Sequence, residues 1–283
     1  MALSEQQLIE SPAFVAALRF LAVNLQGEFD GNPRLSRMLA SHQRWLLSQA
    51  GFALYLEYDP TALPSGLTAG RLKQMITEVD VASRNTVLNF LDQLLSYRFI
   101  RVAGDANRRP RRFEATEISH QAMWQWLAAN LAALDQIDGG DRFAAYCATP
   151  GLFRAVQPRV ARCCIDDRRW REPPERVAIF LWTEAGGLVM DELIRRIEPG
   201  SEQAQGYDIG RVDARAMAGH FMMSRTHLQR LLRKAVDMGC LAWHDDTKKT
   251  HLWMKSDYLE EYCRWQAVKF AIIDKVFAEA RLG

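Results

Sequence analysis

Two serine–arginine pairs, Ser83-Arg84 and Ser224-Arg225, carry the most recognisable chemistry in this sequence. They lie 141 residues apart, and each precedes a run of apolar residues at helical spacing. A serine in this position caps a helix by accepting a hydrogen bond from its first turn. The arginine that follows presents two parallel N–H donors, which match the O6 and N7 acceptors of guanine. Both pairs therefore predict a helix whose first turn can read DNA.

The apolar spacing decides which side of each helix faces outward. One face of the first helix gathers Val87, Phe90, Leu91 and Leu94. On the opposite sides, the residues expected to reach base edges are Arg84, Asn85 and Asn89 in the first helix and Arg225, Thr226 and Arg230 in the second. Residues better placed for phosphates are Ser83, Thr86, Ser224 and His227. Alternatively, both arginines are only solvated at a helix start, but their identical placement in two copies favours DNA contact.

Two hairpins are expected after these helices, and they differ in charge. The first has strand-like runs at 99–102 and 112–116 and a tip with four arginines, namely Arg108, Arg109, Arg111 and Arg112. Arginines in such a tip suit phosphates or a narrow minor groove. The second hairpin, 240–254, has Asp245 and Asp246 before Lys248 and Lys249, so a solvent-facing turn and a DNA contact are equal alternatives. The first half is expected to rely on its hairpin and the second on its helix, which also carries Arg233 and Lys234.

The surrounding elements follow the same order in both halves. Thr68 is expected to cap a helix over 69–77, and Ser83 a helix that runs to about Tyr97. Asp213 is expected to cap a helix through Phe221, and Ser224 one that ends before Gly239. Two short helices with a tight turn form a helix-turn-helix, and a following hairpin makes it winged. Long helices at 118–137 and 256–280 complete a mainly α fold with small β-hairpin wings, an α+β class.

The repeated order extends beyond the helix pair. Residues 76–102 and 217–243 align without a gap, and residues 11–14 correspond to 149–152 at an offset of 138. At an offset of 139, Trp126, Ala128, Ala132 and Asp135 line up with Trp265, Ala267, Ala271 and Asp274. Three correspondences in one order predict a duplicated unit of roughly 140 residues. The expected domains are 1–138 and 139–283, each a winged-helix unit with flanking helices.

Composition is that of a soluble globular protein. The 283 residues are 48% hydrophobic and 25% charged, and the net charge of +2 is too small to decide about nucleic acid. No apolar run approaches the roughly 20 residues of a membrane span, and the first residues lack the pattern of a secretion signal. Five cysteines without C-x-x-C spacing indicate a reduced protein, so we expect a cytoplasmic location and no membrane partner.

Few residues indicate other chemistry. Paired carboxylates, a Ser/His/Asp order and a phosphate-binding glycine loop are missing from the sequence, so we expect neither an enzyme nor a cofactor. His244 and His251 lack a recognised metal-ligand spacing, and no metal site is expected. Cys163-Cys164 is interpreted as packing, with redox sensing as the alternative. The helices that carry Trp124, Trp126, Trp265 and Phe270 are expected to join the halves, with an aromatic-lined pocket for a small-molecule effector as a further interpretation.

The second unit resembles a known pattern. The stretch from Met217-Ala218 through Ser224-Arg225 to Gly239 is similar to bacterial regulators in which a small residue packs two helices and Ser-Arg begins the recognition helix. With long helices on either side, the architecture resembles the MarR family of transcription factors, here as a single-chain pseudo-dimer. The resemblance covers most of the chain. The first unit departs from it, because Thr77 stands at the small-residue position and Arg98 at the glycine position.

The resemblance and the outward-facing residues together imply a function. We expect a sequence-specific regulator of transcription, acting as a repressor, that binds double-stranded DNA as a monomeric pseudo-dimer; further oligomerisation stays open. Its site would be an imperfect inverted repeat with recognition elements roughly 34 Å apart. The alternatives are a plasmid or phage replication initiator with tandem winged-helix domains, and a winged-helix protein-interaction module that does not bind DNA.

Overall fold

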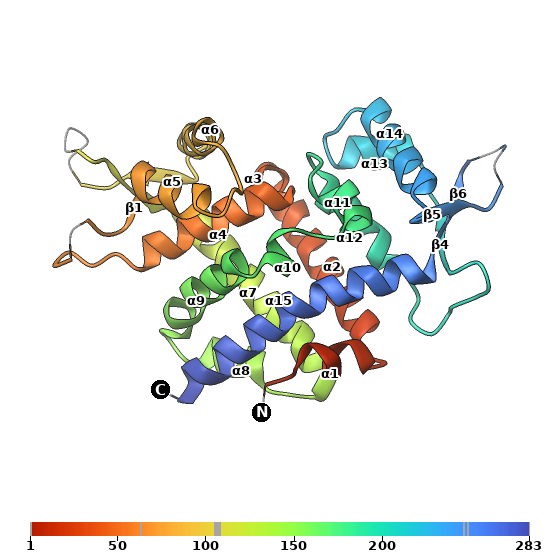
Figure 1. Cartoon of the computed structure of the whole chain (residues 1–283), viewed down its shortest axis with the longest axis horizontal. Helices are drawn as coiled ribbons and strands as arrows, with labels where there is room; N and C mark the ends of the chain where they lie inside the picture. Colours follow the sequence, from red (N-terminus) through yellow and green to blue (C-terminus); the bar gives the residue numbers. More distant parts are fainter. Residues whose placement is uncertain (1, 63, 105–108, 246, 248, 283) are drawn as a thin grey trace.

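The computed structural model describes residues 2–62, 64–104, 109–245, 247 and 249–282. Helices dominate this part of the chain, and two three-stranded antiparallel sheets complete it (Figure 1). The mainly helical α+β class expected from the sequence is confirmed. None of the described helices is long and apolar enough to cross a membrane.

The first half of the chain contains elements from α1 to α7. In order they are α1 (Glu5–Glu10), α2 (Phe14–Gly31), α3 (Pro33–Leu39), α4 (His42–Leu56), β1 (Leu67–Thr68), α5 (Ala69–Thr77), α6 (Arg84–Ser96), β2 (Ile100–Val102), β3 (Arg112–Ala115) and α7 (Glu117–Asp138). The second half continues with α8 (Arg142–Ala148), α9 (Leu152–Asp166), α10 (Arg168–Arg171), α11 (Glu175–Leu181), α12 (Gly186–Arg195), β4 (Tyr207–Arg211), α13 (Ala214–His220), α14 (Arg225–Asp237), β5 (Leu241–Trp243), β6 (His251–Met254) and α15 (Ser256–Leu282).

The order of elements is nearly the same in the two halves. Each half has a strand, two short helices, a hairpin and a long closing helix, and the last strand lies in the middle of each sheet, in the orders β1-β3-β2 and β4-β6-β5. The main difference in the described residues is one additional helix in the second half, where α8 to α12 precede β4, whereas α1 to α4 precede β1. The first long helices begin at Phe14 and Leu152, at the offset of 138 found in the sequence.

Side-chain caps set the starts of the short helices. Ser83 Oγ accepts a hydrogen bond from the backbone N–H of Thr86 at 3.2 Å, and Ser224 Oγ accepts one from that of His227 at 3.1 Å. The preceding helices are capped by Thr68 and Asp213. These caps satisfy first-turn N–H groups that have no partner within the helix. The predicted starts of α5, α6, α13 and α14 are therefore confirmed.

The departure at Arg98 does not change the way in which α6 ends. Arg98 has a φ of 59°, and Gly239, which follows α14, has a φ of 69°. Both residues adopt the left-handed conformation that commonly ends a helix. Arginine pays roughly 1 kcal/mol for this conformation, which glycine adopts without steric cost. The helix pairs of the two halves consequently end alike despite the difference in sequence.

The two expected hairpins are present as β2–β3 and β5–β6, and each sheet also has a third strand that the sequence did not indicate. β1 places Leu67 opposite Phe113, and β4 places Gly210 opposite Leu252. β1 has only two residues, too few for an alternating pattern, and β4 is interrupted by a bulge between Asp208 and Gly210. Both strands form by pairing with a distant segment, which local sequence does not reveal.

The long helices of the two halves pack reciprocally. The first-half helix α2 packs on α7 of its own half and on α12 of the other, while α9 packs on α15 and on α4. The short helices follow the same rule, since α1 packs on α15 and α8 on α7. Such exchange of equivalent contacts is the pattern of a two-fold interface. Because α4 of the first half packs on α9 of the second, the buried residues of both halves form one continuous core. Figure 1 shows these helices side by side between the two sheets.

Two aspartates at the 139-residue offset make equivalent contacts. Asp274 Oδ2 accepts a hydrogen bond from the backbone N–H of Leu3 at 2.7 Å, and Asp135 Oδ1 accepts one from that of Arg142 at 3.0 Å. The buried guanidinium of Arg142 also binds Asp274, with Nε 2.6 Å from Oδ1, and its hydrogen bonds to Asp138 lower the pKa of that carboxyl. This network ties α7 and α8 to the closing helix α15.

Candidate nucleic-acid interface

The helices α6 and α14 lie apart from each other, one left and one right of the centre of Figure 1. In Figure 1 both are along the upper edge of the view, above the helical core. Each packs on the short helix before it, α5 and α13 respectively. The inward residues predicted for α6 are buried, and so are Leu228, Leu231, Leu232 and Ala235 of α14. The faces opposite these buried residues are therefore exposed to solvent in both helices.

The candidate residues of α6 are mostly exposed. Arg84, Asn85 and Asn89 face solvent, as does the capping Ser83. Thr86 is half-buried, and its Oγ1 lies 2.9 Å from Ser83 Oγ. The two hydroxyls are hydrogen-bonded to each other, and that of Ser83 also caps the helix. Both are therefore less available to a phosphate than the sequence suggested. The exposed arginine and asparagines keep their hydrogen-bonding edges toward solvent.

The candidate residues of α14 are all exposed, and this helix is strongly basic. Ser224, Arg225, Thr226, His227 and Arg230 face solvent. Two further cations, Arg233 and Lys234, are exposed on the following turn. Within the described part of the chain, none of the four cations of α14 forms a salt bridge. Such unneutralised charge next to a helix start favours a phosphate-bearing partner.

A cation that sequence reasoning missed lies beside this helix. Arg215 is exposed in the first turn of α13, whose cap is Asp213. The pKa of Asp213 is lowered by hydrogen bonds from the backbone N–H groups of Ala216 and Arg215, with a smaller contribution from the charges of Arg215 and Arg225. The first turns of α13 and α14 thus present two guanidinium groups near one carboxylate. The signal in the sequence was the position of Arg215, two residues after the cap.

The arginines of the first hairpin are not equivalent. Arg109 and Arg111 are exposed, whereas Arg108 lies outside the described residues. Arg112 is half-buried, with its guanidinium carbon 3.9 Å from the centre of the Tyr58 ring. Its Nη1 also lies 3.9 Å from Glu114 Oε2, and Arg101 pairs with the same carboxylate. Arg112 therefore stabilises the sheet, and Arg109 and Arg111 are the better candidates for DNA.

The second hairpin offers one described candidate. Lys249 is exposed, with a φ of 46°, and its backbone N–H donates to the carbonyl of Asp245 at 3.0 Å. Lys248 and Asp246 lie outside the described residues. At the turn end of β6, His251 Nε2 lies 2.6 Å from Asp208 Oδ1 on β4. That contact holds the third strand to the hairpin.

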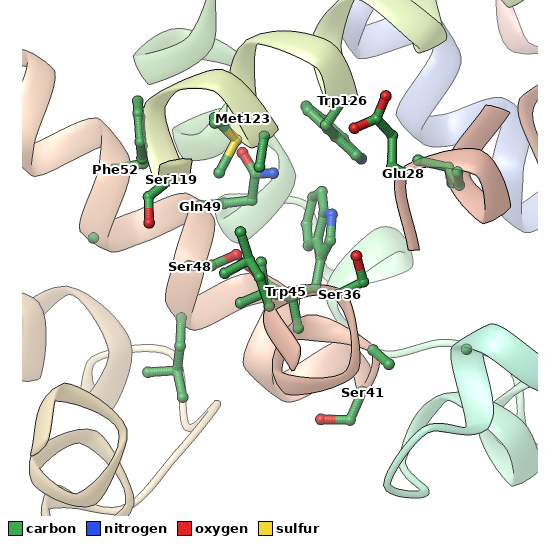
Figure 2. A pocket seen from close by; sticks show the side chains of 18 of the residues that line it. Glu28, Ser36, Ser41, Trp45, Ser48, Gln49, Phe52, Ser119, Met123 and Trp126 are labelled. Atoms are coloured by element: carbon green, nitrogen blue, oxygen red, sulfur yellow. The ribbon is translucent and has the colours of Figure 1, made fainter. Parts of the chain in front are cut away.

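The aromatic residues expected between the halves form a cluster beside a cavity. The rings of Trp170 and Trp265 stack with their centres 4.0 Å apart, and Trp45 lies 5.4 Å from Trp170 and 5.6 Å from Trp126. Trp126 and Trp265 line a cavity of about 500 Å³, whereas Trp124 stacks on Tyr146 and does not line it. This region therefore contains both buried core residues and a cavity (Figure 2).

No known protein family matches the chain, and searches of curated proteins and of solved structures find no match either. In the described part of the chain, the α14 surface combines exposed cations with a capped helix start, and it is the strongest candidate for binding another molecule.

Proposed function

We propose that this protein is a sequence-specific DNA-binding regulator of transcription, built from two winged helix-turn-helix units that arose by duplication. The observation that carries the proposal is the equivalence of α6 and α14. Each begins at a serine cap followed by an exposed arginine, buries the same apolar positions, and precedes a three-stranded sheet. A helix-turn-helix of this form reads bases with the first turns of its second helix.

The reciprocal packing of the long helices supports a single-chain pseudo-dimer. A regulator that binds as a dimer aligns two recognition helices with two half-sites of an inverted repeat. Here α2, α4, α9 and α12 supply equivalent contacts within one chain. Because α6 lacks the excess positive charge of α14, the two half-sites would differ in sequence and in the strength of their phosphate contacts. The MarR-like architecture favours repression as the outcome.

Selection of bound duplexes from random double-stranded DNA tests this proposal directly. We expect an imperfect inverted repeat, one chain bound per site, and half-sites about one helical turn apart, roughly 34 Å. Affinity for the selected duplex should fall steeply as salt is raised, because bound cations release counterions. Selection of repeated direct sites would indicate a replication initiator instead. Absence of any salt-dependent DNA binding would leave a protein-interaction module and refute the proposal.

A further inference from the structure

The two helix pairs differ in net charge. From cap to last residue, the pair α5–α6 (68–96) contains three cations and three anions, so it has no net charge. The pair α13–α14 (213–237) contains five cations and two anions, a net charge of +3 with histidine neutral. Three cations of α14 correspond to uncharged or acidic residues of α6: Arg230 to Asn89, Arg233 to Asp92 and Lys234 to Gln93. The first pair therefore has little charge with which to hold phosphates.

An exposed leucine lies on the outward face of α6. Leu88 is 36% exposed, and it follows Arg84 and Asn85 by four and three residues. Residues at these spacings are neighbours on one face of a helix. The equivalent residue of α14 is Gln229, which is also exposed. The face of α6 that carries the candidate DNA contacts thus includes an apolar side chain that α14 lacks at that position.

The neighbours of Leu88 on this face are amides. Asn85 and Asn89 are exposed, and within the described residues neither side-chain amide has a hydrogen-bond partner. In the major groove, an asparagine amide matches N6 and N7 of adenine, and an apolar side chain packs on the methyl group of thymine. Adenine and thymine form one base pair, so the amides and the leucine favour the same kind of DNA.

The hairpin of the first half suits the same base pairs. Arg109 and Arg111 are exposed on it. A-tracts have a narrow minor groove, and its enhanced negative potential attracts arginine side chains. Both α6 and the hairpin that follows it are therefore compatible with one stretch of A·T base pairs.

We propose that the first unit recognises an A·T-rich half-site, in which Leu88 packs on the 5-methyl group of a thymine and Asn85 and Asn89 pair with adenines. The half-site under α14 is recognised through arginines, which suit guanine, and it carries most of the phosphate contacts. Because the leucine contact requires α6 to lie in the major groove, it rests on the proposed function of DNA binding.

Replacement of thymine by deoxyuridine, which lacks only the 5-methyl group, tests this contact. Each thymine of the selected duplex is replaced in turn, and binding of the full-length protein is measured. We expect one replacement to weaken binding of the natural chain by about fourfold, because burial of one methyl group contributes about that factor. Leu88→Ala should bind that duplex and the unmodified one equally, within about 1.5-fold. The sensitive thymine should lie in the half-site with more A·T base pairs.

Three further variants separate the methyl contact from a general loss of binding. Leu88→Met keeps an apolar side chain and should keep the preference for thymine over deoxyuridine, whereas Leu88→Gln should lose it. Gln229→Ala, at the equivalent position of α14, should leave the effect of deoxyuridine in the A·T-rich half-site unchanged. Since Leu88 is uncharged, Leu88→Ala should weaken binding without a change in the salt slope.

Three results would overturn the leucine contact while DNA binding itself stands. They are the absence of any thymine whose effect disappears in Leu88→Ala, the location of that thymine in the half-site richer in G·C base pairs, and retention of the thymine preference in Leu88→Gln. Failure of the natural chain to bind any duplex is a separate result, because it refutes the proposed function as a whole.

Discussion

Replacement of Arg225 by alanine is the sharpest test of the DNA-binding surface. Arg225 is the first residue of α14, it is exposed, and it forms no salt bridge within the described residues. Its loss should change the free energy of unfolding by no more than about 0.5 kcal/mol, as for other surface substitutions. Any larger effect on DNA affinity must then come from a lost contact with DNA.

The size of that effect depends on what the arginine contacts. A bidentate contact with a guanine contributes about 1 to 3 kcal/mol of discrimination, so Arg225→Ala should weaken binding to the selected duplex by about 5- to 140-fold. Discrimination should be lost at one position of one half-site only. By contrast, Lys234→Ala, on the same helix, should weaken binding to all sequences uniformly and reduce the salt slope by about one, as expected of a phosphate contact.

Fluorescence anisotropy on the selected duplex and on single-base variants measures both effects. Arg168→Ala is the matched control, because Arg168 is exposed on α10 and pairs only with Glu172 among the described residues. Arg84→Ala should relax discrimination in the other half-site. If Arg225→Ala binds every duplex as tightly as the natural chain does, within about twofold, α14 does not read DNA and the proposed function is refuted.

Four further substitutions test the fold by urea denaturation. Gly187→Ala should destabilise the protein by about 1 to 3 kcal/mol, because a Cβ there would lie 2.3 Å from the carbonyl oxygen of Ala40; Gly219→Ala, which meets no atom within 4 Å, should not destabilise it. Asp274→Asn should cost about 3 kcal/mol by weakening the buried pair with Arg142, and a cost under about 0.5 kcal/mol would contradict the structural role of that network. Ser224→Ala should cost about 1 kcal/mol through loss of the α14 cap, and an unchanged midpoint would contradict that role.

Local signals allowed the helices to be predicted from the sequence. The caps Ser83 and Ser224 and the apolar spacing behind them identified α6 and α14, because capping and amphipathic spacing depend on neighbouring residues. The third strands were missed because β1 and β4 exist only through pairing with β3 and β6. The inward role of Arg112 was missed for the same reason, since Tyr58 approaches it from a distant part of the chain.

The cavity was predicted only in outline. Tryptophans in the closing helices indicated an aromatic region, but nothing in the local sequence marked Lys269 of α15, which also lines the cavity. A lysine on a helix is usually solvated, and this one is buried because α9 and α10 pack on α15. Its neutral counterpart Asn130 is the one available signal, because a repeat that places a charge in one copy and an amide in the other marks a position where the halves differ in chemistry.

The reciprocal packing of α2 on α12 and of α9 on α4 has a consequence for how binding depends on protein concentration. Two separate subunits dissociate on dilution, and occupancy of a site by a dimeric DNA-binding protein then falls with the square of the subunit concentration. In this chain the two halves are covalently joined near Gly139, so they stay together at any protein concentration. Occupancy of a DNA site should therefore rise in simple proportion to the number of chains while the site is mostly empty, even when a cell holds only a few copies.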